Sequence, residues 1–252
     1  MIIDTHMHLY DNKFENIREE VIKESLEAGI KKLIVVGCDY NSSVKAIELS
    51  KKYDFIYAAV GVHPSEAHKE TDKDLSWIYE FCKNDKVVAI GEIGLDYYWD
   101  KTYVDLQKEF FVKQINIAKE LNLPIIVHSR DSISDTFNIL KTNQTNGVLH
   151  CYSGSVEMAK KFVKLGYFLG IGGVLTFNNS KEIKKVVEEI DLSNLLTETD
   201  APYLAPVPFR GKINKSSYIP YIIDKICEIK NLDKVYVEKT LYENAHKLFN
   251  LN

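Results

Sequence analysis

The sequence contains few of the residues that build linkers and disordered tails. Its 252 residues include only 12 glycines and 6 prolines. Hydrophobic residues make up 45% and charged residues 27%, which is ordinary for a folded protein with a full core. The length would permit two small domains, but a single α/β barrel has about the same size. We therefore predict one domain that spans residues 1–252.

Long apolar runs are also absent. No stretch is long enough to cross a bilayer, and the chain starts directly on a short apolar segment without the basic and hydrophobic regions of a signal peptide. Its four cysteines are widely separated and form no Cys-x-x-Cys pair, so we expect reduced, packed thiols and no disulfides. These features predict a cytoplasmic protein that contacts no membrane.

The chain lacks an excess of positive charge. Lys and Arg number 32 against 36 Asp and Glu, which gives a formal net charge of −4. This charge argues against broad nonspecific binding to nucleic acid, which usually needs a basic patch. A phosphate-bearing substrate is still compatible, because bound divalent cations would reverse the local potential. No feature indicates an obligate protein partner.

Eight short apolar segments are typical of buried strands, and most are separated by amphipathic helical patterns. They cover residues 2–6, 32–37, 55–62, 87–92, 124–128, 147–150, 167–171 and 195–199. Near-continuous apolar strands indicate burial on both faces, as in a parallel sheet covered by helices. Eight alternating units predict an α/β protein with a single (β/α)8 TIM barrel. An open doubly wound sheet is the alternative, although no glycine-rich dinucleotide-binding turn supports it.

Histidines and acidic residues gather at the ends of these predicted strands, where the loops of a parallel barrel form one rim. His6 and His8 share one face of an extended strand, so both imidazoles can bind one cation. Each histidine alone could be a hydrogen-bonded core residue. Their joint placement with acids favours a metal centre, because burying these groups without cations would carry a large desolvation cost. The predicted ligands are His6, His8, Glu92, His128, His150 and Asp200.

This ligand set has room for two divalent ions. Imidazole and carboxylate together suit Zn²⁺ or Mn²⁺, whereas Mg²⁺ prefers oxygen, so the metal can be Mg²⁺, Mn²⁺ or Zn²⁺. Glu92 comes from the middle of the strand order and can bridge two ions through its two oxygens. The histidines of the first strand and Asp200 would complete one ion, and His128 and His150 the other.

Six motifs resemble those of TatD-related metal-dependent deoxyribonucleases. They are DTHMH at 4–8, GVHP at 61–64, GEIGLDYY at 91–98, HSRD at 128–131, HCYSGS at 150–155 and TETDAPYL at 197–204. Each motif alone is of weak to moderate specificity, but their order and spacing match the family along essentially the whole chain. The resemblance implies a TIM barrel of the metal-dependent hydrolase superfamily, nuclease activity and a two-metal site formed by the six ligands above.

The resemblance also singles out His63 and Glu198 beside the metals. Glu198 and Asp200 are two residues apart, so both should face the interior of the barrel. There Glu198 could orient a ligand from beneath the metals or could simply pack in the core. The family often continues an Arg-Gly-Lys segment with Asn-Glu-Pro, whereas this chain has Asn-Lys-Ser at 214–216. That departure puts the shape of the loop and its substrate contacts in doubt, but not the metal ligands.

Three basic residues on the rim are candidates for contact with phosphate, namely Arg130, Arg210 and Lys212. A guanidinium group matches phosphate oxygens through paired hydrogen bonds. Each of these residues could equally be a solvated surface charge or a partner of Asp131. Aromatic residues nearby could stack on unpaired bases or serve as packing lids. They are Tyr97, Tyr98, Trp99 and Phe209.

The combined prediction is an enzyme that hydrolyses phosphodiester bonds in DNA with a metal-activated water. Asp200 would receive the proton of the water and Glu92 would bridge the metals. His63 would bind a phosphate oxygen or assist the leaving group. Metals deep in a barrel mouth favour single-stranded DNA or frayed ends over an intact duplex. The sequence does not decide between DNA and RNA.

Two other functions fit the same residues. Related barrels use similar metals to hydrolyse small amides, lactones or phosphate esters. Many such amidohydrolases have a modified bridging lysine where this chain has Glu92. The second alternative is a noncatalytic nucleic-acid-binding protein with a structural metal. Structural zinc sites are usually closed by four protein ligands, whereas this set leaves room for water and substrate.

Overall fold

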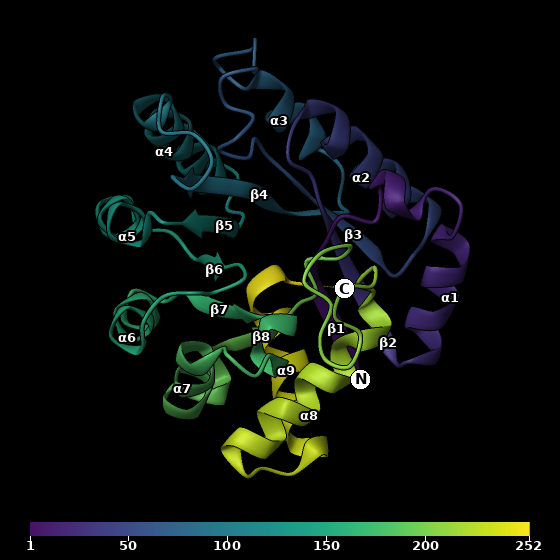
Figure 1. Ribbon diagram of the computed structural model, residues 1–252. Helices are drawn as coiled ribbons and strands as arrows, with labels where there is room; N and C mark the ends of the chain where they lie inside the picture. The colour runs from purple at the N-terminus through teal and green to yellow at the C-terminus, as the bar shows by residue number, and fades with distance from the viewer. Residues whose placement is uncertain (252) are drawn as a thin grey trace.

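The computed structural model describes residues 1–251, and its strands form one eight-stranded sheet in the order of the chain, from β1 to β8 (Figure 1). All paired neighbours are parallel. The strands are Ile2–Met7, Ile30–Val36, Ile56–Val60, Val87–Asp96, Ile125–Arg130, Gly147–Leu149, Phe168–Ile171 and Leu195–Thr197. Each predicted strand overlaps one of them, and the predicted TIM barrel is confirmed.

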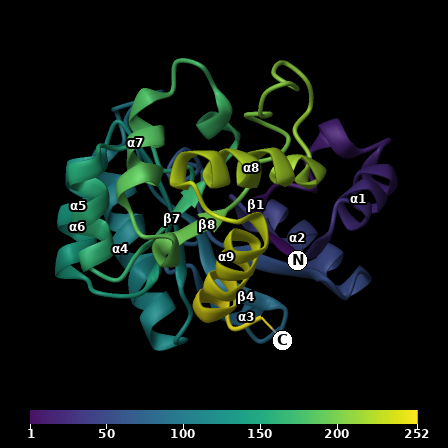
Figure 2. The ribbon, with the colours of Figure 1, turned by 90° about the horizontal axis from the view of Figure 1, so that it is seen from below.

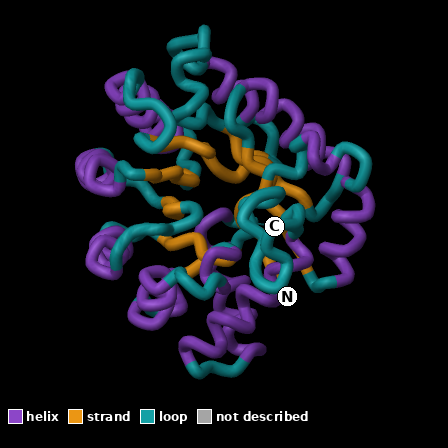
Figure 3. Tube along the Cα trace, in the orientation of Figure 1, coloured by secondary structure: helices purple, strands orange, loops and turns teal. Residues whose placement is uncertain are grey.

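Helices form the outer layer around the strands (Figure 3). The helices between consecutive strands are α1 Arg18–Glu27, α2 Tyr40–Lys52, α3 Ser76–Phe81, α4 Val104–Glu120, α5 Ile133–Thr142, α6 Val156–Lys164 and α7 Lys181–Glu189. Two more follow β8, namely α8 Ile219–Lys230 and α9 Lys234–Phe249. Short 3-10 turns are η1 Asn12–Phe14, η2 Gly173–Thr176, η3 Leu192–Asn194 and η4 Ser216–Tyr218. Within residues 1–251, no helix has the length and apolar character needed to cross a membrane.

Apolar side chains close one end of the barrel. One buried cluster takes residues from all eight strands, which can meet only in the barrel interior. It includes Ile3 and Phe168, near the starts of their strands, and Leu248, Phe249 and Leu251 from the end of the chain. Helix α9 packs beside β1 and β8 (Figure 2). The amino-terminal end of the barrel is therefore filled, and polar side chains can collect only at the opposite end.

The barrel closes between β1 and β8 through polar contacts. The backbone N–H of His8 donates to the carbonyl of Ala201 at 2.8 Å. The hydroxyl of Thr5 donates to the carbonyl of Thr197 at 3.0 Å. The Thr197 hydroxyl donates in turn to the carbonyl of Ile3 at 3.2 Å. Hydroxyl groups thus supply part of the pairing that backbone amides supply elsewhere in the sheet.

The seam between β1 and β8 is stabilised by Asp4, which is fully buried. Its Oδ1 accepts the backbone N–H groups of His6 (3.2 Å) and Thr199 (3.1 Å). Its Oδ2 accepts the hydroxyls of Thr199 (2.7 Å) and Ser216 (2.6 Å). Burial outweighs these hydrogen bonds and raises the pKa of Asp4 to about 7. A single carboxyl group therefore joins β1, the segment after β8 and η4.

Replacing Asp4 with alanine should destabilise the fold, because it removes the common acceptor of four buried hydrogen bonds. We expect the free energy of unfolding to fall by about 2–4 kcal/mol near pH 5. The folded-state pKa lies above the usual value of 3.8, so the stabilisation by Asp4 is largest at low pH and decreases as the pH rises through about 7. The loss should accordingly be smaller near pH 8.

Chemical denaturation of Asp4→Ala and of the unaltered protein at both pH values measures this effect. Glu20→Ala, on the exposed side of α1, is the control and should change stability by less than about 0.5 kcal/mol. A loss that grows from pH 5 to pH 8 would contradict the raised pKa.

Candidate metal centre

All six predicted metal ligands meet at the open, carboxyl end of the barrel. Each lies on a different strand or just beyond its end, except that β1 and the residue after it supply two. The side chains of four are less than 10% exposed, and those of His128 and Asp200 are 17% and 18% exposed. The set is His6, His8, Glu92, His128, His150 and Asp200. The two more exposed ligands mark the side of the centre that a substrate can reach.

Glu92 lies between two groups of imidazoles. Its Oε2 is 3.4 Å from Nε2 of His6 and 3.8 Å from Nε2 of His8. Its Oε1 is 2.8 Å from Nδ1 of His128 and 3.6 Å from Nε2 of His150. The two oxygens thus face two separate sets of nitrogen donors. This is the partition that the sequence predicts for a carboxylate that bridges two ions.

Asp200 completes the group around Oε2 of Glu92. Its Oδ1 lies 3.3 Å from Nε2 of His8 and 3.9 Å from Nε2 of His6. The two Nε2 atoms are themselves only 3.3 Å apart. Two imidazole nitrogens and two carboxylate oxygens therefore converge on one small volume. A cation with nitrogen and oxygen ligands fits this donor set.

The second ring nitrogen of three ligands is close to an acceptor. Such contacts fix the tautomer and the orientation of a metal-bound histidine. The pairs are Nδ1 of His8 with the Val36 carbonyl (2.9 Å), Nε2 of His128 with Oδ2 of Asp96 (3.0 Å) and Nδ1 of His150 with Oε1 of Glu198 (3.1 Å). Each ring can therefore keep its proton on the outer nitrogen and present a lone pair to the centre.

Glu198 points into the interior, as its separation from Asp200 predicts. It is 1% exposed, and its Oε1 also accepts the backbone N–H of Cys151. Gly170 makes room for the carboxylate, because a Cβ there would lie 2.2 Å from Oε2 of Glu198. The carboxylate is thereby held against His150. Its predicted role as an orienting group has this contact as its structural basis.

Asp96 is a site residue that the sequence analysis missed. It ends β4, four residues after Glu92, and binds His128 as described. The available signal was parity, because residues 92 and 96 share a face of an extended strand. Between them Gly94 has a φ of 140°, and a Cβ there would lie 2.0 Å from the carbonyl oxygen of His128. Glycine thus permits the close approach of β4 and β5.

His63 lies beside the centre and presents a donor to it. Its Nε2 is 3.7 Å from Oε1 of Glu92. Its Nδ1 accepts the backbone N–H of Ser65 at 3.1 Å, so the proton of the neutral ring is on Nε2. Burial and the neighbouring His128 lower the pKa of His63 to about 3. His63 is therefore neutral near pH 7 and offers an N–H group, not a lone pair.

The imidazoles of the centre help to hold the carboxylates of Glu92 and Asp200 in the charged form. Burial alone would raise the pKa of Glu92, but the charge of His150 and the hydrogen bond from His128 help to hold it well below the usual value. Burial would likewise lower the pKa of His150, but Glu198 and Glu92 outweigh it and raise this pKa to about 9. Protons on imidazoles thus balance the carboxylates until a cation replaces them.

The three predicted phosphate-binding residues lie on the rim. Arg130 is the last residue of β5, two residues after His128. Arg210 and Lys212 lie in the loop between β8 and η4, with the Arg210 guanidinium 3.9 Å from the ring centroid of Phe177. No ion pair joins any of the three to an acidic side chain within residues 1–251, so the alternative pairing with Asp131 is not found.

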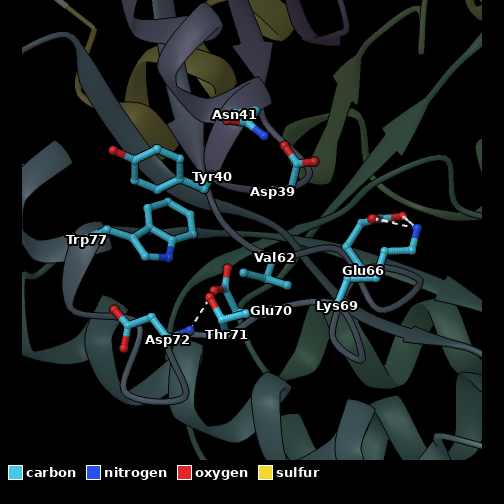
Figure 4. Close-up of a pocket in the computed structure, with 10 residues that line it drawn as sticks. All are labelled: Asp39, Tyr40, Asn41, Val62, Glu66, Lys69, Glu70, Thr71, Asp72 and Trp77. Carbon is cyan, nitrogen blue, oxygen red and sulfur yellow. Dashed lines mark hydrogen bonds and ion pairs between the residues drawn. The ribbon is translucent and has the colours of Figure 1, made fainter.

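An acidic cavity of about 630 Å³ is lined mainly by the segments that follow β2 and β3, on that side of the centre. Figure 4 shows its lining residues. Two of its lining residues are next to residues of the site: Val62 precedes His63, and Asp39 follows Cys38, whose Sγ is 3.9 Å from Oε2 of Glu92. Its charged lining residues are Asp39, Glu66, Glu70, Asp72 and a single lysine, Lys69. This excess of carboxylates disfavours phosphate on this side of the rim.

Three comparisons relate the chain to known proteins. The family model described as TatD related DNase matches residues 3–250. The uncharacterized metal-dependent hydrolase YabD of Bacillus subtilis is 45% identical over 255 residues, with 100% of both chains covered. The structure of the TatD homolog YjjV of Escherichia coli has a TM-score of 0.94 and 32% identity, covering 100% of this chain and 98% of that one. A TatD family hydrolase of Entamoeba histolytica has a TM-score of 0.88 at 25% identity, covering 100% and 98%.

Metal affinity should rise with pH. Below its pKa of about 9, His150 carries a proton in the metal-free protein, and a metal must displace that proton to bind the ring. We expect the association constant for Zn²⁺ or Mn²⁺ to increase by about tenfold per pH unit between about pH 6 and pH 8. Titration calorimetry in buffers of different ionisation enthalpy measures both the affinity and the proton release. A constant affinity across this range would contradict the raised pKa.

Glu198→Gln should weaken metal binding without removing a ligand. The amide keeps the size of the side chain but loses the negative charge beside Nδ1 of His150. We expect the dissociation constant for the ion held by His150 to rise by about 10–100-fold. The exposed Glu189→Gln on α7 is the matched control. Equal affinities of the two variants would show that Glu198 has only a packing role.

Proposed function

The chain belongs to the family of TatD related DNases, and we propose that it hydrolyses phosphodiester bonds in DNA with two divalent ions. Membership in this family makes the protein a metal-dependent hydrolase. The observation that supports two ions is the position of Glu92, whose two oxygens face different groups of histidines. When bound, such ions activate a water molecule and offset the charge that develops on the phosphate.

Six side chains would hold the two ions between them. Glu92 would contribute one oxygen to each ion. Asp200 and the two histidines of β1 would hold one ion, and His128 and His150 the other. Because nitrogen and oxygen donors are mixed, Zn²⁺, Mn²⁺ and Mg²⁺ are the ions to test.

Two residues have roles beyond holding metals. Asp200 reaches the open side of the centre and would accept the proton of the attacking water. His63 would donate its Nε2–H to a phosphate oxygen, since its low pKa leaves no second proton to give to the leaving group. Of the two roles that the sequence leaves open for His63, this geometry supports phosphate binding.

The substrate that fits best is an unpaired strand. The ligands are largely buried below the rim, so a phosphate must descend to reach them. A single strand or a frayed end can bend toward the centre, whereas the backbone of an intact duplex is held away by its own width. Arg130, Arg210 and Lys212 would bind phosphates of this strand. All four cysteines are free, which suits the reducing cytoplasm where we place the protein.

The test is cleavage of labelled oligonucleotides by metal-depleted protein to which Mg²⁺, Mn²⁺ or Zn²⁺ is restored separately. Single-stranded DNA should be cleaved at least about tenfold faster than a blunt duplex of the same sequence. RNA of that sequence and a small phosphate ester, included in parallel, identify the preferred substrate class.

His128→Ala should lower the rate by at least about 100-fold, because it removes a predicted ligand. His246→Ala, a histidine on α9 outside the site, is the matched control and should keep full activity. Identical product ladders from His128→Ala and the unaltered protein would indicate a contaminating nuclease. Rapid turnover of the small ester with no cleavage of any oligonucleotide would overturn the proposal.

A further inference from the structure

Two large aromatic side chains on the rim have little packing role. Trp99 is 73% exposed and Tyr98 is 53% exposed, and their rings meet edge to face with centroids 4.8 Å apart. The preceding Tyr97 behaves differently, because it packs on the core and its hydroxyl donates to Asp135 at 2.8 Å. The loop after β4 is therefore anchored by one tyrosine and presents the next two aromatic rings to solvent.

Arg130 joins these rings in one stacked surface. The centre of its guanidinium lies 3.7 Å from the ring centroid of Tyr98 and 5.4 Å from that of Trp99. In the part of the chain that the structure describes, no hydrogen bond or ion pair involves its side chain. A guanidinium that stacks through its face keeps its in-plane N–H groups available for a phosphate. The surface thus combines an aromatic face with an unpaired cation.

Hydrogen bonds connect this surface to the metal centre. The backbone N–H of Tyr98 donates to Oδ1 of Asp96 at 2.9 Å, and Oδ2 of the same carboxylate lies 3.0 Å from Nε2 of His128. Arg130 follows His128 by two residues on β5. The aromatic loop, the guanidinium and a predicted metal ligand therefore share one rigid support. A group bound on the surface would be held in a fixed position relative to the metals.

From these contacts we propose that Tyr98, Trp99 and Arg130 form a platform that binds one unpaired nucleobase of the substrate and its adjoining phosphate. This inference rests on the proposed function, since it takes the substrate to be a nucleic acid. The acidic cavity on the β2–β3 side disfavours phosphates there, so the strand passes the metals on the β4–β5 side. Every base has a π-face, which makes such a platform tolerant of sequence but selective against paired bases.

The experiment compares two oligonucleotides of equal length and charge, an oligothymidylate and a fully abasic strand. Binding to the metal-free protein is followed by the fluorescence anisotropy of an end label, so the result does not depend on cleavage. The oligothymidylate should bind about 5–100-fold more tightly than the abasic strand. Trp99→Ala should reduce this ratio several-fold, and Arg130→Gln should weaken the binding of both strands.

Tyr236→Ala, which removes another exposed aromatic ring, on α9, should leave both affinities unchanged. Fluorescence of the unaltered protein gives a second measurement, because only Trp99 of the two tryptophans is widely exposed and Trp77 is 9% exposed. The oligothymidylate should protect the exposed indole from iodide quenching, and the abasic strand should not.

One result would overturn the platform, namely an affinity ratio that Trp99→Ala leaves unchanged. If both affinities fall by the same factor, Trp99 has only a structural role. A failure of the proposed function would give a different combination of cleavage and binding results. If no metal restores cleavage but the preference that depends on Trp99 persists, the protein binds unpaired bases without hydrolysing the strand. If cleavage is intact but the ratio does not depend on Trp99, the nuclease function stands and the platform does not.

Discussion

The buried carboxylate of Glu92 is the constraint on which the rest of the structure depends. A charged group with 3% exposure is costly unless opposite charges surround it. Three imidazoles with raised pKa values supply that charge, each with a nitrogen within 4 Å of one of its two oxygens, and they belong to His8, His128 and His150. Outer partners such as Asp96 and Glu198 then hold individual rings in place. Each charged group therefore offsets the cost of burying its neighbour. The imidazoles stabilise the buried Glu92, and the outer carboxylates stabilise individual imidazoles.

Closure of the barrel and construction of the site use the same residues. Asp4 accepts the backbone N–H of His6 while it fastens the segment after β8. The backbone N–H of His8 forms part of the β1–β8 contact itself. Stability and metal binding are consequently linked at this seam. Apolar packing by the end of α9 fills the opposite end of the barrel, which leaves one end for chemistry.

The two sides of the rim differ in charge and in aromatic content, and this difference affects which substrate can bind. Carboxylates line the cavity between the β2 and β3 loops, whereas Arg130 and exposed aromatic rings lie beyond β4 and β5. Metals and ligands alone fit many esters and amides, because the same barrel serves many substrates. In our proposal, the charges and rings around the mouth select a strand of nucleic acid over a small molecule.

The amino-acid pattern alone predicted the eight strands, the six candidate metal ligands near their ends and the shared faces of His6 with His8 and of Glu198 with Asp200. These features follow from patterns within single segments, which are local: apolar runs indicate the strands, and two-residue alternation indicates the shared faces. The contacts of Asp96 with His128, of Asp4 with the segment after β8 and of Arg130 with Tyr98 depend on how the chain packs in three dimensions. In β1 the alternation itself is interrupted: Ile3 and His6 both face the interior, across a register shift between Asp4 and Met7. Register and such shifts depend on which strands become neighbours, and that is set by packing between residues far apart in the chain.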